Sequence, residues 1–163
     1  MNKKAQGALE FLMTYGWAFL VILIMIGALA YFGVLSPSKF LPERCALTTG
    51  LTCTDYKLTD VTLDLKVRNN MGMTINVTTF AATDADGIYN CDDYFIDGIA
   101  LGTDIPIADG ATFDLSGTTC GGGGIALGNK FKIIPTITYY DPRSGVEYDH
   151  DVEGEVYALV QAP

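Results

Sequence analysis

Residues 11–35 read FLMTYGWAFLVILIMIGALAYFGVL, with no charged side chain and no proline. A bilayer core about 30 Å thick needs about 20 apolar residues, because each residue of an α-helix advances about 1.5 Å. The run exceeds that length. It is also too long for a cleavable secretory signal, whose apolar region has about 7–15 residues. A buried helix of a soluble bundle is the less favoured alternative, and we predict a membrane-spanning helix.

Charged residues are distributed unequally on the two sides of this run. Residues 36–163 hold 18 of the 19 acidic and 8 of the 10 basic side chains, a formal charge of −10. A module with that charge and no basic patch repels nucleic acid, so we expect no DNA or RNA partner. Lys3 and Lys4 precede the helix. The positive-inside rule then places the N-terminus in the cytoplasm and the acidic part outside.

All four cysteines lie in the exported part of the chain, and an even number there predicts two disulfides. Their spacing differs from the paired CxxC pattern of zinc sites, so we expect no metal. Four cysteines allow three pairings. We favour the two that close local loops, which are Cys45–Cys53 and Cys91–Cys120.

The residues at the start of the apolar run form a distinct motif. Lys3-Lys4-Ala5 is followed by Gln6-Gly7-Ala8-Leu9-Glu10, which brings one carboxylate into the apolar stretch. A carboxylate in the middle of a bilayer costs about 2.5–3.5 kcal/mol on insertion scales, so such residues usually have a function. The simpler interpretation is that Glu10 lies near the cytoplasmic face and reaches the lipid headgroups.

This motif resembles the class III signal of archaeal type IV pilins and archaellins. The resemblance is specific over residues 3–35 and only architectural beyond them. It implies that a prepilin peptidase cuts between Ala5 and Gln6 on the cytoplasmic side, and that Glu10 is the family's glutamate at the fifth position of the mature chain. It divides the chain into three parts: a leader (1–5), a retained hydrophobic helix (6–40) and an exported head domain (41–163).

The resemblance suggests a role for Glu10 in assembly. Cleavage would create an α-amino group at Gln6, which is positive near neutral pH. In a core of packed helices, Glu10 of a neighbouring subunit would neutralise that amine, because an unpaired charge in a dry setting is costly. We therefore assign Gln6 and Glu10 to assembly. A contact from Glu10 to the amine of its own chain is the simpler alternative.

Small residues along the helix allow other helices to approach closely, although an ordinary membrane anchor would have a similar composition. They are Gly16, Ala18, Gly27, Ala28, Ala30 and Gly33. We expect Pro37 and Pro42 to end the helical region.

From Cys53 onward the apolar period changes to two, which predicts β-strands. Tyr56–Arg68 is predicted as one half-buried strand whose inner face carries Val61, Leu63, Leu65 and Val67. The sequence further predicts a turn at Asn69–Gly72, strands at Thr74–Ala81 and near 94–101 and 111–115, and a flexible loop at Gly121–Gly124. We expect an α+β fold, with a long N-terminal hydrophobic helix followed by a small antiparallel β-sandwich-like domain.

The last part of the chain predicts a β-hairpin, with strands at 130–140 and 146–160 around the turn Asp141–Gly145. Alternation puts five acids on one face, which are Glu147, Asp149, Asp151, Glu153 and Glu155, and puts Val146, Tyr148, His150, Val152 and Val156 on the other. Matching the apolar faces sets the register. It places Tyr139 opposite Tyr148, Ile137 opposite His150, Phe131 opposite Val156 and Lys132 opposite Glu155.

No catalytic set of residues emerges. His150 is interpreted as a core or rim histidine, and the five alternating acids as a solvated face. Asp84-Ala85-Asp86-Gly87 lacks the other ligands of an EF-hand loop, and the glycines at 121–124 lack the lysine of a phosphate-binding loop. We expect neither enzyme activity nor a cofactor. Asn76-Val77-Thr78 is an N-glycosylation acceptor in an exported segment, which makes Asn76 a candidate site.

These observations predict a structural subunit of a surface filament. The precursor would lie in the membrane, and the mature subunit would form a homo-oligomeric extracellular filament with the help of the prepilin peptidase and the pilus assembly machinery. Adhesion to surfaces is the expected role. Two alternatives stay open, an archaellin of a motility filament and a monomeric membrane-anchored ligand-binding module. A simple anchor would not need the Lys3-Lys4-Ala5/Gln6 junction.

Overall fold

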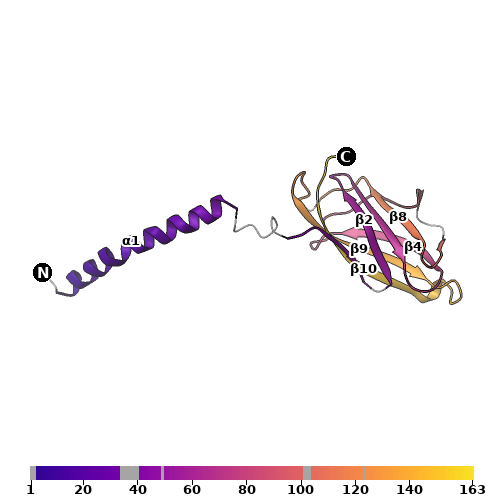
Figure 1. Ribbon diagram of the computed structural model, residues 1–163, viewed down its shortest axis with the longest axis horizontal. Helices are drawn as coiled ribbons and strands as arrows, with labels where there is room; N and C mark the ends of the chain where they lie inside the picture. Colours follow the sequence, from indigo (N-terminus) through magenta and orange to yellow (C-terminus); the bar gives the residue numbers. More distant parts are fainter. Residues whose placement is uncertain (1–2, 34–40, 49, 101–103, 123) are drawn as a thin grey trace. The chain divides into compact units, whose positions relative to one another are not determined.

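The computed structural model describes residues 3–33, 41–48, 50–100, 104–122 and 124–163 (Figure 1). The chain divides into two compact units, Met1–Leu41 and Pro42–Pro163. Within the described residues, the first unit contains the helix α1 and the second contains ten β-strands.

Helix α1 spans Lys3–Tyr31, and no proline interrupts it. Its end is formed by Gly33, whose φ of 70° is the left-handed conformation that glycine adopts most easily. The amide of Phe32 donates to the carbonyl of Ala28 at 2.9 Å, and the amide of Gly33 donates to Ala30 at 3.1 Å. The described helix therefore ends at Tyr31. Pro37 and the rest of 34–40 lie outside the described residues.

The strands of the second unit form two five-stranded sheets (Figure 1). The first sheet has the order β1-β10-β9-β4-β7, and the second has the order β2-β3-β8-β5-β6. All pairings between these strands are antiparallel. The strands are β1 (Arg44–Leu47), β2 (Leu51–Leu58), β3 (Thr62–Asn69), β4 (Ile75–Thr83), β5 (Asp93–Ile96), β6 (Ile99–Ala100), β7 (Ile105–Ile107), β8 (Thr112–Thr118), β9 (Lys130–Tyr140) and β10 (Asp149–Leu159).

One apolar core lies between the two sheets. The second sheet contributes Leu63, Leu65 and Leu115, and the first contributes Ile133 and Ile137, each at most 1% exposed. Burying each such side chain contributes about 1.5–3 kcal/mol relative to leaving it in water. The expected class, an α+β chain with an apolar N-terminal helix and an antiparallel two-sheet domain, is therefore confirmed.

The prediction of one strand over Tyr56–Arg68 is wrong, because the chain reverses within it. β2 ends at Leu58 and β3 begins at Thr62. The hydroxyl of Thr59 accepts hydrogen bonds from the amides of Val61 (3.2 Å) and Thr62 (2.7 Å), which stabilises the turn. Val61 is consequently 43% exposed and does not belong to the inner face.

The other strands of the middle region match the prediction in part. β4 covers the predicted Thr74–Ala81 except for Thr74, with Ile75 and Val77 buried, and β8 extends the strand expected near 111–115. The strand expected near 94–101 is instead a tight hairpin, β5–β6, which reverses at Asp97–Gly98. Gly121 forms an isolated bridge with Asn90, while Gly123 of the predicted loop lies outside the described residues.

The C-terminal hairpin exists, but its predicted register is wrong by two residues. A 3₁₀ turn occupies Val146–Tyr148 (η2), so β10 starts only at Asp149. Tyr139 then pairs with His150, Ile137 with Val152, and Phe131 with Ala158. A shift of two residues preserves the faces of a strand, so Val152 and Val156 are still buried, whereas Val146 and Tyr148 are exposed in the turn.

Candidate assembly helix and head-domain groove

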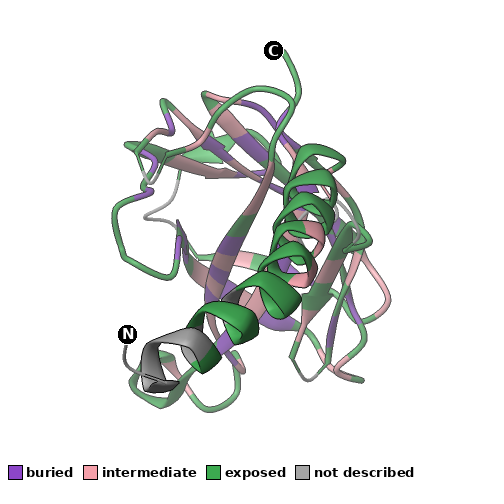
Figure 2. Ribbon diagram, turned by 90° about the vertical axis from the view of Figure 1, so that its left-hand side faces the viewer, coloured by how far each residue is buried: buried purple, intermediate pink, exposed green. Residues whose placement is uncertain are grey.

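Helix α1 carries a long apolar surface that is not buried within the chain. Leu9–Tyr31 is the single described helix that is long and apolar enough to cross a membrane, and none of that span is buried within the chain. Most of the helix is coloured as exposed in Figure 2, and Trp17 and Met13 are 70% and 77% exposed. A free apolar surface of this size requires a lipid or protein environment. The helix is therefore a membrane anchor or a signal sequence by its composition.

Glu10 lies on α1 with its residue exposed. Its backbone carbonyl accepts a hydrogen bond from the hydroxyl of Thr14 at 2.8 Å. This bond satisfies the polar group of Thr14 inside the helix, which lowers the cost of a hydroxyl in an apolar environment. Ala5 and Gln6 lie within the first turns of α1.

The two disulfides join the cysteines in the local pairing that the sequence favours. Cys45 of β1 is bonded to Cys53 of β2, and Cys91 is bonded to Cys120. Cys91 and Cys120 are 2% and 6% exposed, so this bridge belongs to the core. Disulfides of this kind persist in oxidising compartments, which indicates an extracellular location for the β-domain.

A groove of about 760 Å³ lies at one end of the β-domain. It is lined by the β3–β4 turn, by β4 and β7, and by the β9–β10 turn; the lining residues are Gly72, Met73, Thr74, Asn76, Asp104, Pro106, Asp141, Pro142 and Arg143. The chain enters the β-domain at Pro42, next to Arg44, which pairs with Tyr157 near the end of β10. The groove is beside the start of β10, so about 30 Å of strand separates the two places.

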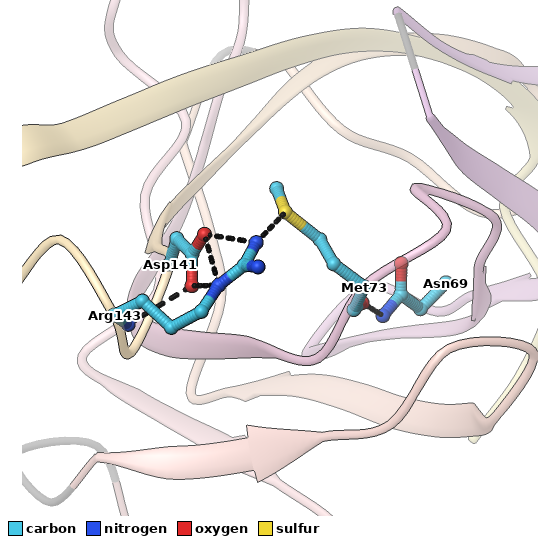
Figure 3. Close-up of polar contacts among 4 residues, drawn as sticks. All are labelled: Asn69, Met73, Asp141 and Arg143. Carbon is cyan, nitrogen blue, oxygen red and sulfur yellow. Dashed lines mark hydrogen bonds and ion pairs between the residues drawn. The ribbon is translucent and has the colours of Figure 1, made fainter.

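Arg143 forms one wall of the groove and is held by two neighbours (Figure 3). Its guanidinium donates to both carboxylate oxygens of Asp141, with the shortest contact at 2.7 Å, and its Nη2 lies 3.8 Å from the thioether sulfur of Met73. The cation lowers the pKa of the Asp141 carboxyl below its ordinary value. The Arg143 side chain is exposed to water and the Asp141 side chain is half-buried, so water weakens the pair and it mainly orders the turn.

Asn69 supports the groove from inside the domain (Figure 3). It is 0% exposed, and its amide nitrogen donates to the carbonyls of Met73 (2.9 Å), Ile107 (3.1 Å) and Ala108 (3.2 Å). Its side-chain oxygen accepts from the amide of Met71 at 3.0 Å. Every polar atom of this buried side chain is used, so Asn69 ties the β3–β4 turn to the β7–β8 connection.

Two lining residues of the groove, Asn76 and Asp104, are linked by hydrogen bonds through Tyr140. The amide nitrogen of Asn76 donates to the hydroxyl of Tyr140 at 2.9 Å, and that hydroxyl donates to the Asp104 carboxylate at 2.6 Å. The bond to Asp104 raises the pKa of the Tyr140 phenol, because it stabilises the protonated form. The glycosylation candidate Asn76 thus lies half-buried in a strand with its amide nitrogen in a hydrogen bond.

The other positions singled out in the sequence have structural surroundings. His150 is exposed, not in the core, and its ring lies 5.6 Å from that of Tyr139. Asp84 accepts hydrogen bonds from the amides of Ile88 (2.6 Å) and Tyr89 (2.9 Å), so its carboxylate closes the 84–89 turn.

The described residues contain no group of three or more His, Cys, Asp or Glu side chains arranged to hold a metal ion. The groove residues Asp104, Asp141 and Arg143 were not identified as a site from the sequence. The sequence predicted the turn at Asp141-Pro142-Arg143, which forms one wall of the groove. It did not predict that Asp104, which is distant in sequence, lies beside this turn. No family model matches the chain, and no curated protein matches it either.

Proposed function

We propose that this chain is a structural subunit of a surface filament of the archaeal type IV pilus kind. The observation that carries the proposal is the apolar helix Leu9–Tyr31, none of which is buried within the chain, combined with the motif that precedes it. A helix that buries none of its apolar surface within its own chain is suited to lie first in a bilayer and then against copies of itself. Attachment to surfaces is the role that we assign to the filament.

Processing is the step that would separate a filament subunit from a simple anchor. We propose that the peptidase cuts between Ala5 and Gln6, which leaves Glu10 four residues from a new amine. The β-domain then forms the outer layer of the filament. Its formal charge and its two disulfides suit an exported, water-exposed module.

A monomeric membrane-anchored ligand-binding module is the second candidate. The groove of about 760 Å³, at the end of the β-domain away from Pro42, favours it. The two candidates differ in what the helix does after insertion. A membrane anchor keeps its N-terminal residues before Gln6 and stays in the membrane. A filament subunit loses them and leaves the membrane as part of a polymer.

The test is N-terminal sequencing and intact-mass measurement of native protein, with negative-stain imaging of cells that have or lack the gene. We expect the mature chain to begin at Gln6 and the filaments to disappear with the gene. A native chain that begins at Met1, or that is cut after residue 35, contradicts the proposal. Filaments that persist without the gene contradict it as well.

A further inference from the structure

Strand β1 is a short edge strand of the first sheet and also the first element of the β-domain. It has four residues, Arg44–Leu47, and lies at the edge of the sheet with β10 as its partner. The chain passes into the β-domain between Leu41 and Pro42. A pull on the anchored helix therefore reaches the domain at the start of β1.

The geometry of the β1–β10 pair makes it easy to unzip. Arg44 pairs with Tyr157 and Leu47 with Gly154, so the start of β1 and the end of β10 lie together. A force applied there opens the ladder one pair at a time instead of shearing all pairs at once. Each backbone hydrogen bond adds only about 1 kcal/mol net, so four residues resist little.

The Cys45–Cys53 bond lies at the second residue of this strand and leads into the other sheet. Cys45 belongs to β1 of the first sheet, and Cys53 belongs to β2 of the second. β2 is paired with β3 from Leu51 to Leu58, and β3 is paired in turn with β8. The covalent bond thus bypasses the rest of β1 and the connection that follows it.

Strand β1 packs closely against β10 at Gly154. A Cβ atom on Gly154 would lie 2.5 Å from Cδ2 of Leu47 and 2.7 Å from the carbonyl oxygen of Ala46, so only glycine leaves room for β1 at this point of β10. The amide of Thr48 donates to the carbonyl of Glu153 at 2.9 Å. Arg44 donates from Nε to Glu155 at 3.0 Å.

We propose that the Cys45–Cys53 disulfide is a tension clip. It stops β1 from unzipping after its first residue and transfers a pull on the helix to β2 and the second sheet. Without the bond, β1 detaches while the remaining strands stay folded. This mechanism needs only an anchored helix, so it applies to a filament subunit and to a membrane-anchored module alike.

Hydrogen–deuterium exchange on the full chain in detergent tests the clip without force. In Cys45→Ala/Cys53→Ala, the β1 amides should exchange on the order of tenfold faster or more, because the loop constraint that opposes local opening is gone. The β2–β3 pair should change little. Gly154→Ala, which displaces β1 with the disulfide intact, should give a smaller increase, and Gly121→Ala, which has open space around its Cβ position, is the matched control. Unchanged exchange in β1 of the double variant overturns the proposal.

Pulling experiments test the clip under tension. The full chain is held at its N-terminus and at Pro163, so that force enters at the one end of the pair where the start of β1 meets the end of β10. The double variant should release a short segment at low force before the main unfolding event, and the oxidised wild-type protein should not. Identical first events in the two proteins overturn the proposal. If the double variant fails to fold, mild reduction of the wild-type protein replaces it. The Cys45–Cys53 disulfide is half-exposed and the Cys91–Cys120 disulfide is buried, so a mild reductant should cleave the first and leave the second intact. These outcomes are independent of whether filaments form.

Discussion

Lys132 and Glu155 form an ion pair of 2.8 Å across β9 and β10, although they are diagonal and not direct neighbours in the ladder. Lys132 is directly opposite Tyr157. Arg44 of β1 donates to the same carboxylate, so Glu155 links three strands of the first sheet. Both cations lower the pKa of the Glu155 carboxyl below its ordinary value of 4.5, with the hydrogen bond from Lys132 as the first cause.

Glu155→Gln should therefore lower the free energy of unfolding near neutral pH. It should also remove the part of the stability that is lost in acid when Glu155 is protonated. Because the folded-state pKa is depressed, the stabilisation is present above the ordinary carboxyl pKa and is lost as pH falls through the lowered value. Urea unfolding of both proteins at about pH 7 and about pH 3 should show a difference that shrinks in acid. Glu153→Gln, on the same strand, is the control. A difference that is constant with pH would contradict the assignment.

Tyr140→Phe should remove the hydrogen bonds that join Asn76, Tyr140 and Asp104. The pKa of the Tyr140 phenol is raised above 10.0, so its stabilisation is present below about pH 10 and is lost as pH rises through the higher folded-state value. Urea unfolding as a function of pH should show wild type converging on the variant in alkali. Tyr148→Phe, at an exposed position, should behave as wild type.

Asn69→Ala should destabilise the β-domain by about 2–4 kcal/mol, because several buried backbone groups lose their partner at once. Asn70→Ala is the matched control, since its exposed amide bonds only the Thr52 hydroxyl among the side-chain contacts described. It should cost less than about 1 kcal/mol. Urea denaturation measures both changes, and equal losses would contradict the role given to Asn69.

Removal of the two disulfides should have unequal effects on global stability. Loop-closure entropy predicts losses of about 2.6 kcal/mol for Cys45–Cys53 and about 3.6 kcal/mol for Cys91–Cys120, because the second loop is longer. The paired alanine variants, compared by urea denaturation, should follow that order. A larger loss for Cys45→Ala/Cys53→Ala would show that packing around β1 outweighs the loop term.

Glu10→Gln should prevent assembly and leave processing intact. The variant retains the size of the side chain and the Ala5/Gln6 junction, so it should insert, be cut and form both disulfides normally. Its filaments should be few or absent, since the Gln6 amine of a neighbour would lose its counter-charge in a dry core. Filament yield is counted by negative-stain imaging against immunoblots of processed protein. Wild-type yield from processed variant would leave Glu10 as a residue of the membrane boundary.

Several features followed from local sequence because local physics determines them. The apolar run forms a helix, because a helix satisfies its backbone hydrogen bonds within the segment and needs no other element for them. The alternation in β3 and β9 placed Leu63, Leu65 and Ile137 on the core side. The short sequence separation within Cys45–Cys53 and Cys91–Cys120 identified the pairs.

Other features depended on backbone conformations and hydrogen bonds that the apolar pattern does not encode. The helix end required the left-handed Gly33, which in the sequence looked like one more small packing residue. The turn at Thr59 divides a run of residues that alternates without interruption. The alternation of apolar and polar residues does not predict this turn, because the turn depends on a hydroxyl that accepts hydrogen bonds from two amides. The 3₁₀ turn at Val146–Tyr148 shifts the register of the hairpin by two residues. A shift of two residues keeps every side chain on the same face, so the apolar pattern cannot distinguish the two registers.

The sequence by itself therefore determined the division of the chain into an apolar helix and an acidic, disulfide-bonded β-domain. The tertiary structure decided which strands share a sheet, the joining of the two sheets through Cys45–Cys53, and the groove that brings Asp104 to Asp141 and Arg143. The physical reason is the range of the forces. Helix formation and face alternation depend on neighbours a few residues apart, whereas strand order and the groove depend on how distant segments share one core.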